Sequence, residues 1–228
     1  MTLTQWFKFA CLLFPVYLSG RKQKLRSFDQ RWFTLKGWCE KFFVDLKINI
    51  KASYQSELGF ETVYYVSNHQ GQFDPILLMA LSKQPMTFIS KEENLKLPVI
   101  GKWGKLIEFI TFKREDFDAN VTMLRQSARV LKEGRSILIF PEGTRSRSND
   151  LLPFKPGALL PAYLAKVAIV PITQIHTHEM DKLGQLKHTL EVIYDEPIPY
   201  ETYKDIPYAQ MATKIHDQIE SNIKKALT

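Results

Sequence analysis

Cysteine is scarce in this sequence. Its 228 residues include only Cys11 and Cys39, and neither lies near a second thiol or a histidine at ligand spacing. This excludes a disulfide framework, and we expect no metal site. The chain also has no internal repeat, no low-complexity tract and no small-residue cleavage site that would end a secretory signal. We therefore expect the bulk of the chain to stay in the cytosol.

A long uninterrupted apolar run is also missing. The most apolar segment, residues 3–18, contains Lys8 and Pro15. As a helix it would measure about 24 Å, whereas the hydrocarbon core of a bilayer is about 30 Å thick. We expect it to enter one leaflet without crossing the membrane. A basic cluster follows, which would favour anionic headgroups on the cytoplasmic side of a cell membrane: Arg21, Lys22, Lys24 and Arg26.

A second segment carries a hydrophobic stripe at helical spacing, formed by Phe28, Trp32, Leu35, Cys39, Phe42 and Leu46. Three of the four tryptophans lie in these first two segments, and tryptophan partitions well to the membrane interface. We interpret residues 1–47 as a two-helix membrane anchor that binds peripherally or as a monotopic element. The alternative is that both helices pack on the globular core.

From residue 48 onward, short β-like runs alternate with helical ones, which is typical of an α/β domain over residues 48–228. The expected strands are residues 62–66, 86–90, 107–112, 136–140 and 167–174. A helical stripe on Val121, Leu124, Ala128 and Leu131 could begin at Asp118 and end at Gly134. A last helix shows the same stripe on Met211, Ile215, Ile219 and Ile223.

The net charge is +7, from 31 basic and 24 acidic residues. Such a balance favours an anionic partner, which could be a phospholipid headgroup, an acidic carrier protein or nucleic acid. The lysines are dispersed among acidic residues and no nucleic-acid motif is present, so we expect no nucleic-acid partner.

A candidate acid–base pair follows the expected strand 62–66. His69 lies in a turn that enters a helix, with Asp74 as the expected N-cap and Pro75 at the first helical position. The loop is short enough to bring the Asp74 carboxylate back to the His69 ring. A carboxylate on one imidazole nitrogen leaves the other free to accept a proton. Alternatively, Asp74 only caps the helix and His69 only fills the turn.

A matching nucleophile is absent from the sequence. There is no Gly-x-Ser-x-Gly elbow, and neither cysteine is near this loop. The nucleophile could therefore be the hydroxyl of the substrate itself.

A second candidate group follows the expected strand 136–140. The turn contains Glu142, Gly143, Thr144 and Arg145, and the ends of strands are where ligands usually bind in α/β sheets. Arg145 offers a planar fork suited to a phosphate, and Gly143 allows a close approach of the backbone to a ligand. Further cations end two other expected strands: Lys91, Lys113 and Arg114. The alternative for Lys91 and Lys113 is a solvated surface charge, and we favour it for Lys113.

The stretch Asn68-His69-x-x-x-x-Asp74 and the stretch from Phe140 to Ser146 together resemble the glycerolipid acyltransferase family, which includes 1-acylglycerol-3-phosphate O-acyltransferases. Two further similarities are the block 104–114 and the Val-Pro-Ile at 170–172, and a third is Phe-Lys-Pro-Gly at 154–157. One departure is Lys113, where relatives more often carry an acidic residue. The resemblance covers roughly residues 60–175 and implies a mixed sheet flanked by helices.

The resemblance also implies a mechanism without an acyl-enzyme. His69, held by Asp74, would remove the proton from an acceptor hydroxyl as that hydroxyl attacks a thioester carbonyl. Lysophosphatidic acid is the implied acceptor, the donor would be acyl-CoA or an acyl carrier protein, and no further cofactor is implied. By the same resemblance Arg114, Gly143 and Arg145 would hold the acceptor, with Glu142 fixing that loop or the acceptor. Lys91 at a strand end and Thr144 in the turn complete the set of expected substrate-binding residues.

Three other functions fit the same residues. The acceptor could be glycerol-3-phosphate or another lysophospholipid. Water could replace the acceptor, which would make the protein a hydrolase. A non-catalytic anionic-lipid binder could use the basic surface, although such a protein has no need of His69 and Asp74.

Overall fold

A seven-stranded mixed sheet forms the centre of the protein, in a computed structural model that describes all residues except 1–12, 58, 60, 114–116 and 183–185. The strand order is β1-β7-β6-β2-β5-β3-β4. All neighbouring strands are parallel except β6 and β7, which are antiparallel. The strands are β1 Ile50–Tyr54, β2 Val63–Ser67, β3 Met86–Lys91, β4 Ile110–Phe112, β5 Ser136–Ile139, β6 Ala168–Ile175 and β7 Leu190–Tyr194.

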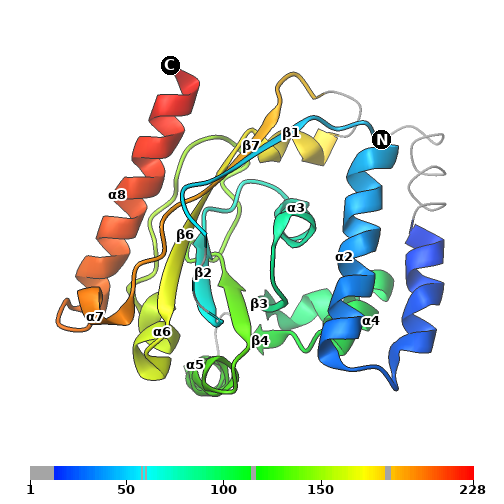
Figure 1. Cartoon of the computed structure of the whole chain (residues 1–228), viewed down its shortest axis with the longest axis horizontal. Helices are drawn as coiled ribbons and strands as arrows, with labels where there is room; N and C mark the ends of the chain where they lie inside the picture. Colours follow the sequence, from blue (N-terminus) through cyan, green and yellow to red (C-terminus); the bar gives the residue numbers. More distant parts are fainter. Residues whose placement is uncertain (1–12, 58, 60, 114–116, 183–185) are drawn as a thin grey trace.

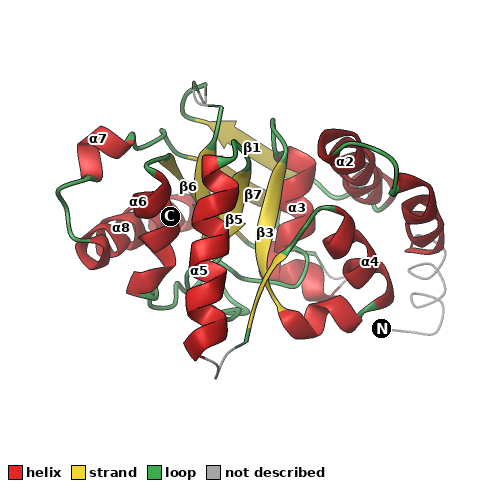
Figure 2. Ribbon diagram, turned by 90° about the horizontal axis from the view of Figure 1, so that it is seen from below, coloured by secondary structure: helices red, strands yellow, loops and turns green. Residues whose placement is uncertain are grey.

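Helices cover both faces of this sheet, as Figures 1 and 2 show. One face carries α2 (Phe28–Asp45), α3 (Asp74–Leu81) and α4 (Pro98–Leu106). The other carries α5 (Phe117–Lys132), α6 (Leu160–Ala165) and α8 (Tyr208–Leu227). Shorter elements connect them: η1 (Gly20–Gln23), η2 (Glu92–Lys96), η3 (Pro156–Leu159), η4 (Thr177–Lys182) and α7 (Tyr200–Tyr203). The expectation of a mixed sheet flanked by helices is confirmed.

The alternation of side chains in β2 explains why two helical layers are needed. Val63 and Tyr65 point into the core beneath α2, α3 and α4, whereas Tyr64 and Val66 point into the core beneath α5, α6 and α8. All five residues of β2 are buried, as expected for a central parallel strand with both faces covered.

Four of the five expected strands are present with shifts of one residue at most at each end. The fifth, expected over residues 107–112, is reduced to β4, because α4 continues to Leu106 and the chain then turns at Glu108 with φ 57°. Gly134 lies just after the end of α5 and has φ 85°, as predicted for a glycine that ends this helix. Asp118 is not the cap that we expected, since it lies inside the first turn of α5.

The two-helix membrane anchor expected over residues 1–47 is not supported. In α2, the apolar stripe packs against α3 and α4, and Trp32, Cys39 and Phe43 are buried in the core. The helix therefore follows the alternative interpretation, in which an aromatic stripe at helical spacing is core. Most of the first expected segment lies within residues 1–12, outside the described residues, and residues 13–19 form about two helical turns before η1. The proposed division at residue 47 stays a prediction.

Among the residues that the structure describes, no helix is both long enough and apolar enough to cross a membrane.

Candidate active site

The two predicted groups meet at one edge of the sheet. Strands β2, β5 and β6 are adjacent and parallel, so their carboxyl ends lie side by side. The loop with His69 follows β2, the turn with Glu142 follows β5, and the segment from His176 follows β6. Residues that are far apart in the sequence thereby form one polar site.

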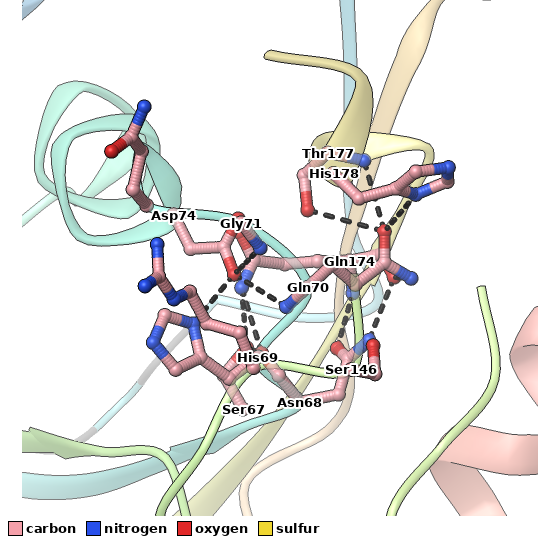
Figure 3. Close-up of polar contacts among 12 residues, drawn as sticks. Ser67, Asn68, His69, Gln70, Gly71, Asp74, Ser146, Gln174, Thr177 and His178 are labelled. Carbon is pink, nitrogen blue, oxygen red and sulfur yellow. Dashed lines mark hydrogen bonds and ion pairs between the residues drawn. The ribbon is translucent and has the colours of Figure 1, made fainter. Parts of the chain in front are cut away.

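His69 and Asp74 are in contact. The His69 Nδ1 atom lies 2.8 Å from Asp74 Oδ2 (Figure 3). The same oxygen accepts hydrogen bonds from the backbone N–H groups of Gln70 at 2.7 Å and Gly71 at 2.9 Å. These donors stabilise negative charge on a fully buried carboxylate. Asp74 does not cap α3 as expected, because Phe73 occupies the N-cap position and the carboxylate is directed back to the loop.

The His69 ring is fixed on a second side by an aromatic contact. It stacks on Phe140, with ring centroids 4.1 Å apart and an angle of 17° between the planes. With Nδ1 facing Asp74, the Nε2 atom is the nitrogen that can exchange a proton with a substrate. About 18% of the His69 side chain is exposed, so a ligand can reach it. The contact with Asp74 assigns the proton of the neutral His69 ring to Nδ1.

Glu142 connects the two loops. Its Oε1 accepts a hydrogen bond from the His69 backbone N–H at 2.6 Å, and its Oε2 accepts one from Leu152 N–H at 3.2 Å. The backbone N–H of Ser146 donates to His69 O, which adds a second connection between the loops. Glu142 is thus a residue that positions the His69 backbone, and its expected part in acceptor binding stays a prediction.

The surroundings of Glu142 also change its ionisation. Burial raises the pKa of this carboxyl from 4.5 to about 7, against the opposing effect of the two backbone hydrogen bonds, and the nearby Asp74 charge raises it further. Only 5% of Glu142 is exposed. The carboxyl therefore exchanges its proton near neutral pH.

A network of amide side chains supports the base of the loop. Asn68 Oδ1 accepts from the Gln174 backbone N–H at 2.7 Å, and Asn68 Nδ2 donates to Gln174 O at 2.9 Å. Gln70 Oε1 accepts from Thr177 N–H at 2.9 Å. Figure 3 shows these contacts joining the loop after β2 to the end of β6. We did not predict this network, although Asn68 was part of the motif that we used.

The predicted anion-binding residues line the turn after β5. Gly143 has φ 67°, and a Cβ atom there would lie 2.9 Å from Lys155 Nζ, so the glycine leaves room for this ammonium group. Thr144 is exposed, and Arg145 is 37% exposed with a guanidinium nitrogen 3.9 Å from Asp181 Oδ2. Lys155 was missed as a site residue, although it belongs to one of the blocks behind the resemblance.

The cations at the other strand ends differ in their surroundings. Lys91 ends β3 at the same edge of the sheet, and it is half-buried. Lys113 is exposed and lies 3.4 Å from Glu92, which agrees with a solvated surface charge. Arg114 lies outside the described residues, so its role in binding stays a prediction. The roles of the other site residues are predictions as well.

This arrangement can perform general base chemistry on a hydroxyl group. It combines an imidazole oriented by a carboxylate, an accessible Nε2 and two cations, Arg145 and Lys155, near the same edge of the sheet. Among the described residues, Asp74 is the side chain that hydrogen-bonds to the His69 ring, and no serine or cysteine does so. The buried thiol of Cys39 has its pKa raised by burial to about 12, which makes it a poor nucleophile.

Curated proteins with similar sequences have related names. The chain is 35% identical over 171 residues to the chloroplastic 1-acyl-sn-glycerol-3-phosphate acyltransferase LPAT1 of Arabidopsis thaliana, covering 73% of this chain and 48% of that protein. It is 30% identical over 174 residues to a probable 1-acyl-sn-glycerol-3-phosphate acyltransferase of Mycoplasma pneumoniae, covering 70% and 65%. The chain thus spans about half the length of the first of these relatives.

A solved structure has the same fold. The crystal structure of the 1-acyl-sn-glycerophosphate acyltransferase PlsC from Thermotoga maritima matches with a TM-score of 0.80 and 20% sequence identity, over 99% of this chain and 95% of the other. At this identity the match establishes the fold. The family model described as Acyltransferase matches residues 51–174, which is more than half of the chain and includes both loops of the site. The protein is therefore a member of the acyltransferase family.

Proposed function

We propose that this protein transfers a fatty acyl chain from a thioester donor to the free hydroxyl of 1-acylglycerol-3-phosphate, which gives phosphatidic acid. The observation that carries the proposal is the 2.8 Å contact between His69 Nδ1 and the buried Asp74 carboxylate at an accessible sheet edge. The family and the names of the curated relatives support the choice of reaction.

The proposed reaction transfers the acyl chain directly from donor to acceptor and needs no acyl-enzyme. His69 Nε2 accepts the proton of the acceptor hydroxyl while its oxygen forms a bond to the thioester carbonyl carbon. The C–S bond then breaks, and the imidazolium formed on His69 can return the proton to the leaving thiolate. Asp74 stabilises that imidazolium and keeps Nε2 directed toward the substrate.

The acceptor phosphate is proposed to bind at the turn after β5. Arg145 and Lys155 bring two positive charges to this turn, and Gly143 keeps the backbone close to Lys155. Lys91 at the end of β3 and the exposed Thr144 are further candidates, and Arg114, which lies outside the described residues, is a candidate from the sequence. The donor is proposed to be acyl-CoA or an acyl carrier protein, since the basic surface suits the phosphates of either one.

We also propose that the protein binds peripherally or as a monotopic protein to the cytoplasmic face of a cell membrane. Three large apolar side chains near the described start of the chain are exposed: Phe14, Leu18 and Leu25. The basic cluster from Arg21 to Arg26 lies among them. This segment is held to α4 by hydrogen bonds from Lys102 Nζ to Tyr17 O and from Trp103 Nε1 to Val16 O. At the start of α4, the N-cap residue Leu97 and the helical residue Ile100 are also exposed and add to the apolar surface.

The function is tested by acyl transfer with the detergent-purified chain. Lysophosphatidic acid, glycerol-3-phosphate and lysophosphatidylcholine are offered with acyl-CoA and acyl carrier protein donors. We expect transfer to lysophosphatidic acid that His69→Ala reduces at least about 10²-fold. The matched control is His216→Ala, which removes a histidine from α8.

Each other outcome identifies a different function. Transfer to another acceptor alone would keep the mechanism and replace the substrate. Release of the acyl chain without any acceptor would indicate a hydrolase. Equal activity in wild type and His69→Ala would refute the proposed base, and no transfer with any pair of substrates would favour the lipid-binding alternative.

A further inference from the structure

Beside the candidate active site lies a second cluster of polar side chains, which the acyl-transfer mechanism does not use. His176 follows β6, Glu179 lies in η4 and His188 precedes β7. Each of the three offers one nitrogen or oxygen atom that lies within 4.8 Å of the other two. The chain has only five histidines, and two of them meet here.

The two histidine rings are parallel. Their centroids are 4.2 Å apart and their planes differ by 14°, so the rings stack, and one of them must turn about its Cβ–Cγ bond before both can direct a lone pair at the same ion. Glu179 lies at one edge of this stack, with Oε1 at 2.6 Å from His188 Nδ1. The cluster thus combines one carboxylate with two imidazoles, and each neutral imidazole has one nitrogen with a lone pair.

All three side chains are held by neighbouring groups. Glu179 Oε2 accepts hydrogen bonds from the backbone N–H groups of Lys187 at 2.7 Å and His188 at 3.2 Å. The His176 ring has Asn149 Nδ2 at 3.1 Å from its Nδ1, and the His176 backbone N–H donates to Asn149 Oδ1 at 2.8 Å. The backbone contacts of Glu179 are of the kind that orient ligands in metal sites, whereas Asn149 Nδ2 donates to the Nδ1 lone pair of His176, which a metal ion would take over.

The cluster is also open to an ion from solution. About 54% of the His188 side chain is exposed, whereas 13% of the Glu179 side chain is exposed. An ion can therefore enter from the His188 side and meet a carboxylate that is already oriented.

We propose that His176, Glu179 and His188 form a binding site for a transition-metal dication such as Zn²⁺. Two imidazole nitrogens and one carboxylate oxygen are a donor set that zinc takes, with water in the fourth position. Imidazole ligands favour zinc, nickel and copper over magnesium and calcium. Ligand atoms around tetrahedral zinc are about 3.3 Å apart, so small side-chain rotations bring the three donors into range.

This proposal differs from the expectation of no metal site. That expectation rested on the two cysteines, which take no part in this cluster. His176 and Glu179 have the spacing of one helical turn, but His188 comes nine residues later. The approach of β6 and β7 is what brings it to the other two.

The ion would connect the end of β6 to the start of β7. Asn149, which orients His176, also accepts a hydrogen bond from Gln70 Nε2 at 3.2 Å, and Gln70 follows His69. Figure 3 shows Gln70 between the His69 loop and Thr177. We therefore expect the ion to stabilise the folded protein, and this expectation does not depend on the proposed acyl transfer.

The competing explanation is that Glu179 and His188 are only an ion pair that holds the connection between β6 and β7. Equilibrium dialysis of the detergent-purified, tag-free chain against ZnCl₂ or MgCl₂ separates the two explanations. A Cys11→Ser background removes a thiol that could bind zinc on its own. We expect one zinc per chain, a rise in Tm with zinc, and neither effect with magnesium.

The variants are His188→Ala and Glu179→Gln, with His216→Ala as the matched control. His216 also lies near an acidic group, with Nδ1 at 3.5 Å from Asp217 Oδ1, but it belongs to no such cluster among the described residues. We expect each cluster variant to weaken zinc binding at least about tenfold, and the control to bind as wild type does. Zinc binding that is absent in wild type, or equal in wild type and His188→Ala, would overturn the proposal.

A second measurement does not depend on the variants folding. Co²⁺ in a four- or five-coordinate protein site absorbs visible light much more strongly than the hydrated ion. We expect wild type to develop this absorption with Co²⁺ and to lose it when zinc is added. Cobalt that stays in its hydrated form would contradict the site.

Discussion

At the scale of single residues, the His69 ring is held by two groups of different chemistry. Asp74 binds Nδ1, and Phe140 stacks against the ring face. The sequence predicted the first contact because both residues flank one short loop. It could not predict the second, since Phe140 comes to His69 only through the pairing of β2 with β5. The role of both contacts is to orient one nitrogen.

Asp74→Asn tests whether the carboxylate orients His69 in the way proposed. We expect kcat to fall at least about 10²-fold, because an amide in this place no longer stabilises the imidazolium formed in the reaction. The acceptor KM should change little, since the Asp74 side chain is fully buried and has no access to the acceptor. Steady-state kinetics at saturating donor measure both constants. The control is Asp45→Asn on the surface of α2, and an unchanged kcat in Asp74→Asn would contradict the role.

Glu142 gives a prediction on stability. Its pKa is raised from 4.5 to about 7. Between these two pH values the folded protein therefore holds a proton that the unfolded chain has lost. This contribution to stability is fully present below pH 4.5 and is lost as the pH rises toward 7. The loss corresponds to about 3 kcal/mol.

Glu142→Gln should remove this pH dependence. We expect the free energy of unfolding of the variant, relative to wild type, to increase by up to about 3 kcal/mol between pH 4.5 and 7.5. The variant also loses some stability because its amide group must face the Leu152 N–H. This loss is the same at every pH, so it does not change how the difference in unfolding free energy depends on pH. Urea unfolding across this pH range measures the difference. Parallel curves for the two proteins would show that Glu142 ionises normally.

At the scale of elements, the central strands were easier to predict than β1 and β7. The runs that became β2, β5 and β6 are buried throughout, as a central strand requires, and the run that became β3 is buried over its first half. The half-buried edge strand β1 alternates between partly buried and exposed residues and was missed. The strand β7 was missed too, because its alternate residues are only partly buried and include Glu191.

Asn68 joins two elements at the base of the site. Asn68→Ala would leave the buried backbone N–H of Gln174 without its side-chain partner, whereas Gln174 O keeps a hydrogen bond from Gln70 Nε2 at 2.9 Å. An unpaired buried group costs about 1–3 kcal/mol, so we expect a loss of stability of that size. The exposed Asn49→Ala is the control and should change stability by less than about 0.5 kcal/mol. Thermal and urea unfolding measure both, and equal stability of the two variants would refute this role.

Two glycines with positive φ separate backbone strain from an effect on the site. Gly143 and Gly134 have φ 67° and 85°, but only at Gly143 would a Cβ displace Lys155. Alanine at either position should cost about 1–2 kcal/mol in stability. Only Gly143→Ala should raise the acceptor KM, by about tenfold, if Lys155 binds the phosphate. Acceptor titrations on the two variants test this, and equal KM values would exclude Lys155 from binding.

At the scale of the whole molecule, the site depends on the order of the sheet. The two motifs are separated by about seventy residues, and they meet because β2 and β5 are neighbours. The resemblance to a family allowed this meeting to be predicted, whereas the sequence pattern alone places no two strands side by side. The amide network between Asn68, Gln70 and the end of β6 could not be predicted for the same reason.

The whole-molecule scale also changes how membrane binding must be tested. Deleting residues 1–47 would remove α2, and with it Trp32, Cys39 and Phe43 from the core, so the remaining chain could fail for reasons unrelated to lipid. Single substitutions on exposed side chains avoid this problem. Leu25 is fully exposed and lies between Lys24 and Arg26.

Leu25→Glu should therefore weaken binding to vesicles that contain anionic phospholipid, with wild-type stability retained. The substitution removes an apolar side chain and adds a negative charge next to a basic cluster, and each basic residue near an anionic surface contributes about 1 kcal/mol. Leu164→Glu, an exposed leucine on α6, is the matched control because α6 covers the other face of the sheet. Vesicle sedimentation at low and high salt measures the binding. If Leu25→Glu and Leu164→Glu weaken vesicle binding to the same extent, the membrane contact lies elsewhere.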